Sequence, residues 1–173
     1  MNFKGKISVT SAPTLWVMCG PSGSGKSTAA RSLTQYYINY VGKPIILIST
    51  DNIRKELFGD ASIQSNGDRV FELAARRIHT ALSNGISVIF DATNLRSNNR
   101  RWVLSQIPKN IKVVRCAIFM RTSLEECIAR QKLRTRQVPE SVISRQFSNY
   151  FFPSHKEGFD HIYTIKGDEI NEF

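Results

Sequence analysis

The sequence predicts an α/β fold in which a parallel five-stranded sheet carries helices on both faces. Short apolar runs rich in Val, Ile, Leu and Phe alternate along the chain with longer stretches whose apolar residues recur at helical spacing. The 173 residues, of which 41% are hydrophobic, suffice for one globular domain with a single core. Because strands that alternate with helices usually pair in parallel, we expect a single domain over residues 1–173.

The five expected strands coincide with the apolar runs. Each run is short and almost free of charged residues, as expected of a strand that is buried on both faces of a sheet. The strands are expected at residues 15–19, 44–49, 87–91, 113–119 and 161–165.

The expected helices lie between and after these strands, where apolar residues recur every three to four positions. Asn84-Gly85 is a typical C-terminal cap for the second helix, and Pro139 stands at the first helical position of the last one. The helices are expected around residues 29–40, 71–82, 97–106, 123–136 and 139–151.

The composition is that of a soluble protein of a reducing compartment. No apolar run approaches the roughly 18 residues of a membrane span, and the run at 15–19 is shorter than a signal-peptide core of about 7–15 residues. Cys19, Cys116 and Cys127 are widely spaced, which favours buried free thiols over disulfides or zinc ligands. We therefore expect a cytoplasmic protein with no membrane partner and no structural metal.

The net charge of +10 is concentrated in one region of the chain. Residues 96–136 contain eleven Lys and Arg against only Glu125 and Glu126, so this stretch carries nearly the whole excess. A concentrated positive region favours a polyanionic partner such as a nucleic acid or the phosphate tail of a nucleotide. The alternative is a solvated helix face.

The strongest motif is GPSGSGKST at 20–28, a full match to the phosphate-binding P-loop pattern, with an apolar run before it and a periodic stretch after it. Its glycines let the backbone wrap round a phosphate, Lys26 neutralises the β and γ phosphates, and the Ser27 hydroxyl ligates Mg²⁺. The motif predicts a site for ATP or another nucleoside triphosphate with Mg²⁺. The nucleotide-binding candidates are Gly20, Pro21, Ser22, Gly23, Ser24, Gly25, Lys26, Ser27 and Thr28.

Two classes of P-loop protein are disfavoured because the sequence lacks their motifs. The chain has no Asn-Lys-x-Asp motif for guanine and no Asp-x-x-Gly switch after the third expected strand, which argues against a GTPase. A motor ATPase commonly follows the corresponding Asp with Glu, whereas Asp91 is followed by Ala92. Phosphoryl transfer to an organic acceptor is therefore favoured over hydrolysis.

Such a transfer requires a base, and Asp51 follows the expected strand 44–49, whose carboxyl end should meet the P-loop. Arg54, one helical turn on, would share its face and hold an anionic group of the acceptor. The alternative is that Asp51 caps a helix and Arg54 is solvated.

Asp91, Thr93 and Asn94, which lie at and just after the end of the expected strand 87–91, are further substrate-binding candidates. Asp91 could also hold a magnesium-bound water or orient Lys26 or Arg54. The alternative for Thr93 and Asn94 is that they only shape the turn.

Arg130 and Arg134 lie four residues apart on an expected helix, hence on one face. They could close over the phosphates as a lid at about residues 123–138 and stabilise transition-state charge, as arginine fingers do. The alternative is a basic solvated helix.

Together these segments resemble the kinase domain of the polynucleotide 5'-kinase family of bacteriophage end-healing enzymes. The matching stretches are GPSGSGKST at 20–28, STDNIR at 49–54, VIFDATNLRSNNRR at 88–101 and ECIARQKLRTRQVPESVI at 126–143. The resemblance implies a P-loop kinase-like fold with a helical lid. It also implies that Asp51 acts as general base, that Arg54 grips a phosphate of the acceptor strand, and that Arg130 and Arg134 cover the donor phosphates.

The sequence departs from the pattern of this family in two places. Asp51-Asn52 replaces the two adjacent Asp residues common in phage relatives, and the chain ends at Phe173 without a phosphatase domain, so removal of 3'-phosphates is not expected. The predicted function is ATP-dependent phosphorylation of 5'-hydroxyl ends of DNA or RNA, as in nucleic acid repair. The rivals are a kinase of a nucleoside, sugar or antibiotic, and a nucleotide-dependent RNA-binding module without catalysis. Retention of Lys26, Ser27, Asp51 and the arginine pair, Arg130 and Arg134, argues against the binding module.

Overall fold

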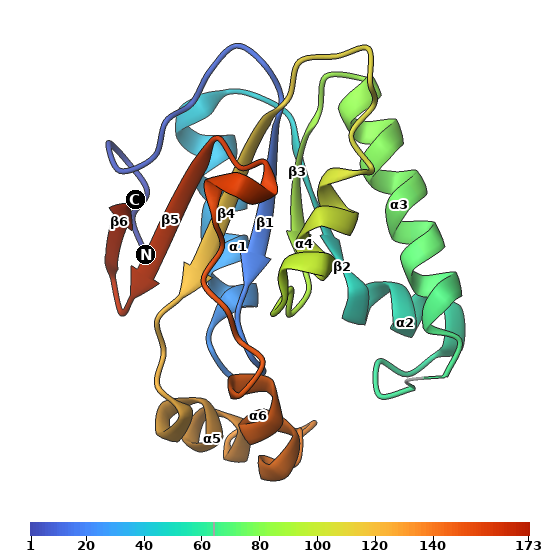
Figure 1. Cartoon of the computed structure of the whole chain (residues 1–173), viewed down its shortest axis with the longest axis vertical. Coiled ribbons are helices and arrows are strands. Elements are labelled where there is room, and N and C mark those ends of the chain that lie inside the picture. The colour runs from blue at the N-terminus through green and yellow to red at the C-terminus, as the bar shows by residue number, and fades with distance from the viewer. Residues whose placement is uncertain (64) are drawn as a thin grey trace.

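In the computed structural model, residues 1–63 and 65–173 are described, and they form a six-stranded sheet with helices on both faces (Figure 1). The strand order is β2-β3-β1-β4-β5-β6, and all neighbours pair in parallel except β5 and β6. The predicted α/β class with its parallel strands is confirmed. The strands are β1 (Thr14–Cys19), β2 (Ile45–Ser49), β3 (Ser87–Asp91), β4 (Val114–Met120), β5 (His161–Lys166) and β6 (Glu169–Glu172).

The antiparallel strand β6 is not predicted by the sequence. Its four residues include a single buried apolar side chain, Ile170, so they show no alternating pattern. The strand forms because Gly167, with φ of +59°, turns the chain back and pairs Lys166 with Glu169. β6 thereby covers the edge of β5.

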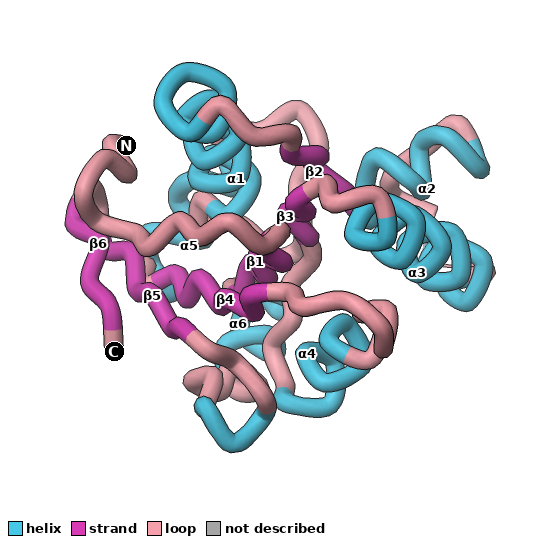
Figure 2. Tube along the Cα trace, turned by 90° about the horizontal axis from the view of Figure 1, so that it is seen from above, coloured by secondary structure: helices cyan, strands magenta, loops and turns pink. Residues whose placement is uncertain are grey.

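Two apolar clusters place the helices on opposite faces of the sheet (Figure 2). Successive side chains of β1 point to alternate faces, so Trp16 packs with Leu33 of α1 while Val17 packs with Ile78 of α3 and Val103 of α4. The helices are α1 (Lys26–Tyr36), α2 (Thr50–Phe58), α3 (Gly67–Ser83), α4 (Ser97–Leu104), α5 (Leu124–Lys132) and α6 (Glu140–Phe147), with a π-helix η1 (Tyr37–Val41) and a 3-10 turn η2 (His155–Glu157).

Four predicted helices end earlier than expected, and α4 is the least affected, since it ends at Leu104 in place of 106. α1 passes into the π-helix η1 at Tyr37, before the predicted end at 40. α5 stops at Lys132 because its buried face ends at Gln131, and the next apolar residue, Leu133, is 88% exposed. α6 stops at Phe147, and the chain then carries the Tyr150 hydroxyl to the Cys19 carbonyl at 2.6 Å, which a continued helix would prevent.

The helices α5 and α6 pack together beyond the carboxyl ends of the parallel strands (Figure 1). Ligands of open α/β sheets bind at this edge, so the fold places α5 and α6 over the expected site. We refer to residues 124–147 as the lid, a longer segment than the expected 123–138 because it includes α6.

The remaining expectations concern thiols, membranes and metals. Cys19, Cys116 and Cys127 are buried and free. In the part of the chain that the structure describes, no helix is long and apolar enough to cross a membrane. The same residues hold no cluster of three or more His, Cys, Asp or Glu that could bind a metal ion.

Candidate active site

The glycine-rich loop at 20–25 joins β1 to α1 at the carboxyl edge of the sheet. Gly23 and Gly25 have φ of +84° and +93°, a region that residues with a Cβ rarely adopt. The Gly20 N–H donates to the Thr93 carbonyl at 2.9 Å, which ties the start of the loop to the segment after β3. The N-terminus of α1 therefore faces the edge of the sheet and offers its N–H groups to a phosphate chain.

Gly23 also lies where the lid contacts this loop. A Cβ built on Gly23 would fall against the Cys127 carbonyl oxygen of α5 and lie 3.0 Å from its carbonyl carbon. Thr122 and Arg130 also bind the P-loop, at the carbonyl of Ser24. The Thr122 hydroxyl donates to this carbonyl at 2.8 Å, and Arg130 Nη1 donates to it at 3.5 Å. The loop and α5 thus form one packed unit.

Gly23→Ala is expected to weaken ATP binding at least tenfold. The new Cβ would combine the strain of a positive φ with a backbone collision, two effects that cost about 1–2 and 1–3 kcal/mol. Gly42→Ala is the matched control, because Gly42 also has a positive φ, of +67°, but a Cβ at this position would meet no other atom within 4 Å. A titration with a fluorescent ATP analogue checks the prediction, and equal losses in both variants would contradict the role of the α5 contact.

Lys26, Ser27 and Asp91 lie together in the part of the cleft formed by the P-loop and the end of β3. Lys26 is buried, and its Nζ donates to the Pro21 carbonyl at 2.9 Å. Burial lowers the pKa of Lys26, and the nearby Asp91 carboxylate opposes this shift. The Ser27 hydroxyl donates to Asp91 Oδ2 at 2.7 Å, so a hydroxyl and a carboxylate oxygen already lie together. Mg²⁺ prefers such oxygen ligands alongside water and phosphate, so these two residues fit the ion.

A cleft of about 950 Å³ opens between the P-loop, α2, the end of β3 and the lid. In the described chain its lining includes six basic side chains and two carboxylates, an excess of positive charge in one cavity. The basic residues are Lys26, Arg54, Arg96, Arg134, Arg136 and Arg145, and the acidic ones are Asp51 and Asp91. The 96–136 region contributes only part of this charge, because Arg100 pairs with Glu157 and Arg115 with Asp160.

Asp51 lies in the first turn of α2 and lines the cleft. The cap of α2 is Ser49, whose hydroxyl accepts from the Asn52 N–H at 3.5 Å, so Asp51 is not needed as the cap. Its side chain is 62% exposed, and Oδ1 accepts from Arg54 Nη1 at 3.3 Å. Arg54 itself is largely covered, with 12% of its side chain exposed. The predicted pair therefore lies side by side on the wall of the cleft.

Arg130 and Arg134 do not form the predicted pair on one helix face. α5 ends at Lys132, so Arg134 lies in the connection after it and lines the cleft near Lys26. Arg130 remains on α5, where its guanidinium lies 3.3 Å from the Glu126 carboxylate and contacts the outside of the P-loop. Arg134 thus lines the cleft, whereas Arg130 contacts the P-loop from outside the described cleft lining.

Of Thr93 and Asn94, too, only one lines the cleft. Thr93 lines the cleft, while the Asn94 amide is buried and donates to the Met18 carbonyl at 2.7 Å. Asn94 has φ of +46°, a conformation that Asn tolerates better than most residues. Its side chain closes the turn after β3 and stays outside the described cleft lining.

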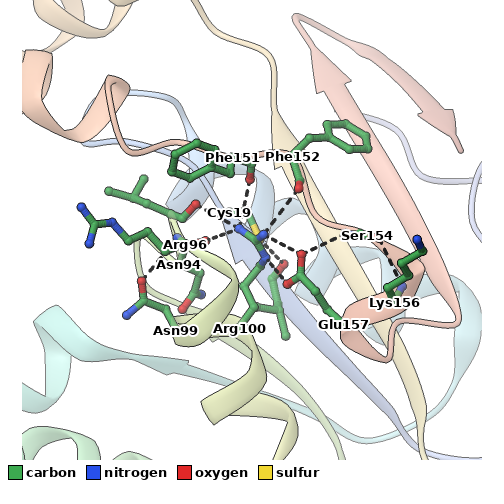
Figure 3. Close-up of polar contacts among 12 residues, drawn as sticks. Cys19, Asn94, Arg96, Asn99, Arg100, Phe151, Phe152, Ser154, Lys156 and Glu157 are labelled. Carbon is green, nitrogen blue, oxygen red and sulfur yellow. Dashed lines mark hydrogen bonds and ion pairs between the residues drawn. The ribbon is translucent and has the colours of Figure 1, made fainter.

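Three residues that stabilise the surroundings of the site are not predicted by the sequence. Gln146 of α6 accepts from the Ser22 N–H at 2.7 Å, and Tyr150 stacks on Phe119 with ring centroids 4.2 Å apart. Arg100 is fully buried and makes a two-pronged ion pair with Glu157, with both distances 2.8 Å (Figure 3). No local pattern marks Gln146 or Tyr150, because Gln146 bonds the P-loop 124 positions away and the Tyr150 hydroxyl bonds the Cys19 carbonyl 131 positions away.

Figure 3 shows Arg100 between two segments that border the cleft. Its guanidinium donates to the carbonyls of Asn94 and Leu95, in the loop after β3, and to those of Phe151 and Phe152, in the segment after α6. Arg100 thereby joins the segment that carries Asp91 to the segment that leaves the lid.

A protein-family model described as an AAA domain matches residues 15–153. The chain belongs to this AAA domain family. The match runs from β1 through the P-loop to the residues that follow the lid, so it contains every element that lines the cleft. With its intact P-loop, this AAA domain is a nucleoside triphosphate-binding domain.

Solved structures share the fold of this AAA domain. A chain of the Pnkp1/Rnl/Hen1 RNA repair complex is 23% identical with a TM-score of 0.68, and the match covers 90% of this chain and 49% of that one. Kti12 from Chaetomium thermophilum, in complex with ADP-AlF3, is 18% identical with a TM-score of 0.66 and 89% of both chains covered. A gluconokinase from Sinorhizobium meliloti 1021 is 20% identical with a TM-score of 0.57, covering 90% of this chain and 85% of that one.

Two chains from structures of the Pnkp1 complex match, and this AAA domain spans 43% and 49% of their lengths. The similar structures include proteins described as a gluconokinase and as a sugar kinase. The fold is therefore that of the P-loop kinases.

Proposed function

We propose that the chain transfers the γ-phosphate of ATP to the 5'-hydroxyl end of DNA or RNA. The observation that carries this proposal is the cleft, in which a P-loop and a carboxylate at Asp51 share one cavity with a strong excess of arginine. A nucleotide needs only part of that positive charge, and an acceptor that brings its own phosphates accounts for the rest.

The residues divide the proposed reaction among them. The P-loop N–H groups and Lys26 hold the β and γ phosphates, and Ser27 with Asp91 would hold Mg²⁺, which supplies charge neutralisation between those phosphates. Asp51 accepts the proton of the attacking hydroxyl as the new bond from its oxygen to the γ-phosphorus forms. The bond between the γ-phosphorus and the bridging oxygen of the β-phosphate breaks at the same time, and ADP leaves. Arg54 binds a phosphate of the acceptor strand, and Arg134 meets the charge that develops on the transferred group.

The similarity to a chain of an RNA repair complex supports a nucleic acid end as the acceptor, and this assignment would make the chain a repair kinase. A small-molecule kinase is the second candidate, favoured by the similar folds of the gluconokinase and the sugar kinase. A neutral sugar would bring no negative charge to the guanidinium groups of Arg96 and Arg145 in the cleft lining. The charge of the lining therefore favours the polymer.

Incubation with γ-labelled ATP and Mg²⁺ is expected to label a 5'-hydroxyl oligonucleotide. The same oligonucleotide with a 5'-phosphate is the matched control, because it keeps every other phosphate and lacks the acceptor. Adenosine and gluconate complete the panel as small acceptors. Label in adenosine or gluconate but not in the oligonucleotide would move the assignment to a small-molecule kinase, and no label in any acceptor would favour a binding module.

A further inference from the structure

Arg136 bridges the mouth of the cleft from the lid to α2. It lies in the connection between α5 and α6 and lines the cleft. Its Nη1 is 3.7 Å from Asp51 Oδ2, while Asp51 Oδ1 accepts from Arg54 Nη1 at 3.3 Å. Each oxygen of the proposed base therefore faces a different guanidinium.

The two arginines retain unused hydrogen-bonding capacity. Arg54 Nε is buried, and among the described residues it has no hydrogen-bond partner. A guanidinium carries five N–H donors, so one long contact with Asp51 leaves most of those of Arg54 and Arg136 available. A buried donor without a partner carries a free-energy penalty that a bound acceptor group would remove. Both guanidinium groups thus have donors to offer to an anionic group that binds beside Asp51.

We propose that Arg136 is a specificity-determining residue of the acceptor site, an inference that rests on the proposed phosphoryl transfer. In the free protein the guanidinium of Arg136 lies against one oxygen of Asp51. When an acceptor carries a phosphate beside its reacting hydroxyl, Arg136 and Arg54 turn to that phosphate, and one Asp51 oxygen becomes free to accept the hydroxyl proton. An acceptor without a phosphate leaves Arg136 on the base.

The strengths of the two contacts favour this exchange. The Asp51–Arg136 pair is long and its side chains are 62% and 41% exposed, and exposed pairs of this kind are weak. Arginine binds phosphate through two parallel, charge-assisted hydrogen bonds, which are stronger. The contact with Asp51 therefore yields to a phosphate but persists in its absence.

Arg136→Gln removes the charge of Arg136. Its matched control is Lys132→Gln, which removes one positive charge from the exposed end of α5, outside the cleft lining. The first readout is the affinity for adenosine 3'-phosphate and for adenosine, without ATP, measured by calorimetry. Arg136→Gln is expected to weaken binding of adenosine 3'-phosphate about tenfold and to leave that of adenosine unchanged, because one charged hydrogen-bonding group is lost.

The second readout is the turnover of the same two acceptors at saturating ATP. Arg136→Gln should lower kcat/KM for adenosine 3'-phosphate about tenfold and raise it for adenosine about two- to fivefold, since no guanidinium then pairs with Asp51 Oδ2. Opposite changes on two acceptors are not expected of a residue that only stabilises the lid. Equal losses on both acceptors would overturn the role of Arg136 and leave the proposed function standing.

The binding readout separates the two proposals even if no transfer is detected. Asp51→Asn should release Arg136 and tighten binding of adenosine 3'-phosphate about twofold or more, and this gain should vanish in the Asp51→Asn/Arg136→Gln double variant. A gain that persists in the double variant, or wild-type affinities that are equal for both compounds, would overturn the inference. Absence of transfer to every acceptor of the panel would overturn the proposed function alone.

Discussion

Asp51→Asn is expected to lower the turnover of phosphoryl transfer by about 10²- to 10⁴-fold, the usual contribution of a general base. The amide keeps the size of the side chain but has no oxygen basic enough to take the hydroxyl proton. Ser49 caps α2, so the substitution leaves the helix start intact. Single-turnover transfer to a 5'-hydroxyl oligonucleotide, measured at saturating acceptor, isolates the chemical step from binding.

Asp68→Asn is the matched control for that experiment. Asp68 also lies in the first turn of a helix, α3, but it is exposed and outside the cleft lining. Both variants lose a favourable interaction with a helix N-terminus, worth about 0.3–1 kcal/mol of stability. If turnover of Asp51→Asn fell by less than about threefold, Asp51 would not be the base.

Arg100→Met is expected to destabilise the fold by about 3–5 kcal/mol, which corresponds to a fall in Tm of roughly 6–20 °C for a chain of this size. The substitution leaves the Glu157 carboxylate, 5% exposed, as a buried charge without its cation. It also removes the donors that the carbonyls of Leu95 and Phe151 share. Thermal unfolding followed by circular dichroism measures the change.

Arg101→Met is the control, because Arg101 is the next residue of α4 and is exposed. The Arg100→Met/Glu157→Leu double variant should regain a large part of the lost stability, since replacing both partners of a buried pair removes the uncompensated charge. A loss below about 1 kcal/mol in Arg100→Met, or no recovery in the double variant, would contradict the importance of this ion pair.

The nucleotide end of the site is predictable from sequence because its residues are contiguous. Nine neighbouring residues at 20–28 make the P-loop, and the apolar run before them and the periodic stretch after them place it between a strand and a helix. Asp51 and Asp91 follow from the rule that strands of a parallel sheet end at one edge. The prediction fails where helix ends depend on distant packing, as at Lys132 and Phe147.

By itself the sequence determined the α/β class, the P-loop and the positions of Asp51, Arg54 and Asp91, because local spacing and strand polarity set them. Only the tertiary structure decided which cations reach the cleft. It paired Arg100 with Glu157 and Arg115 with Asp160, and it left Arg134 and Arg136 in the cleft lining. The basic region 96–136 forms one continuous stretch along the chain, but whether a guanidinium meets a carboxylate or a cavity depends on contacts between distant segments, which linear spacing does not encode.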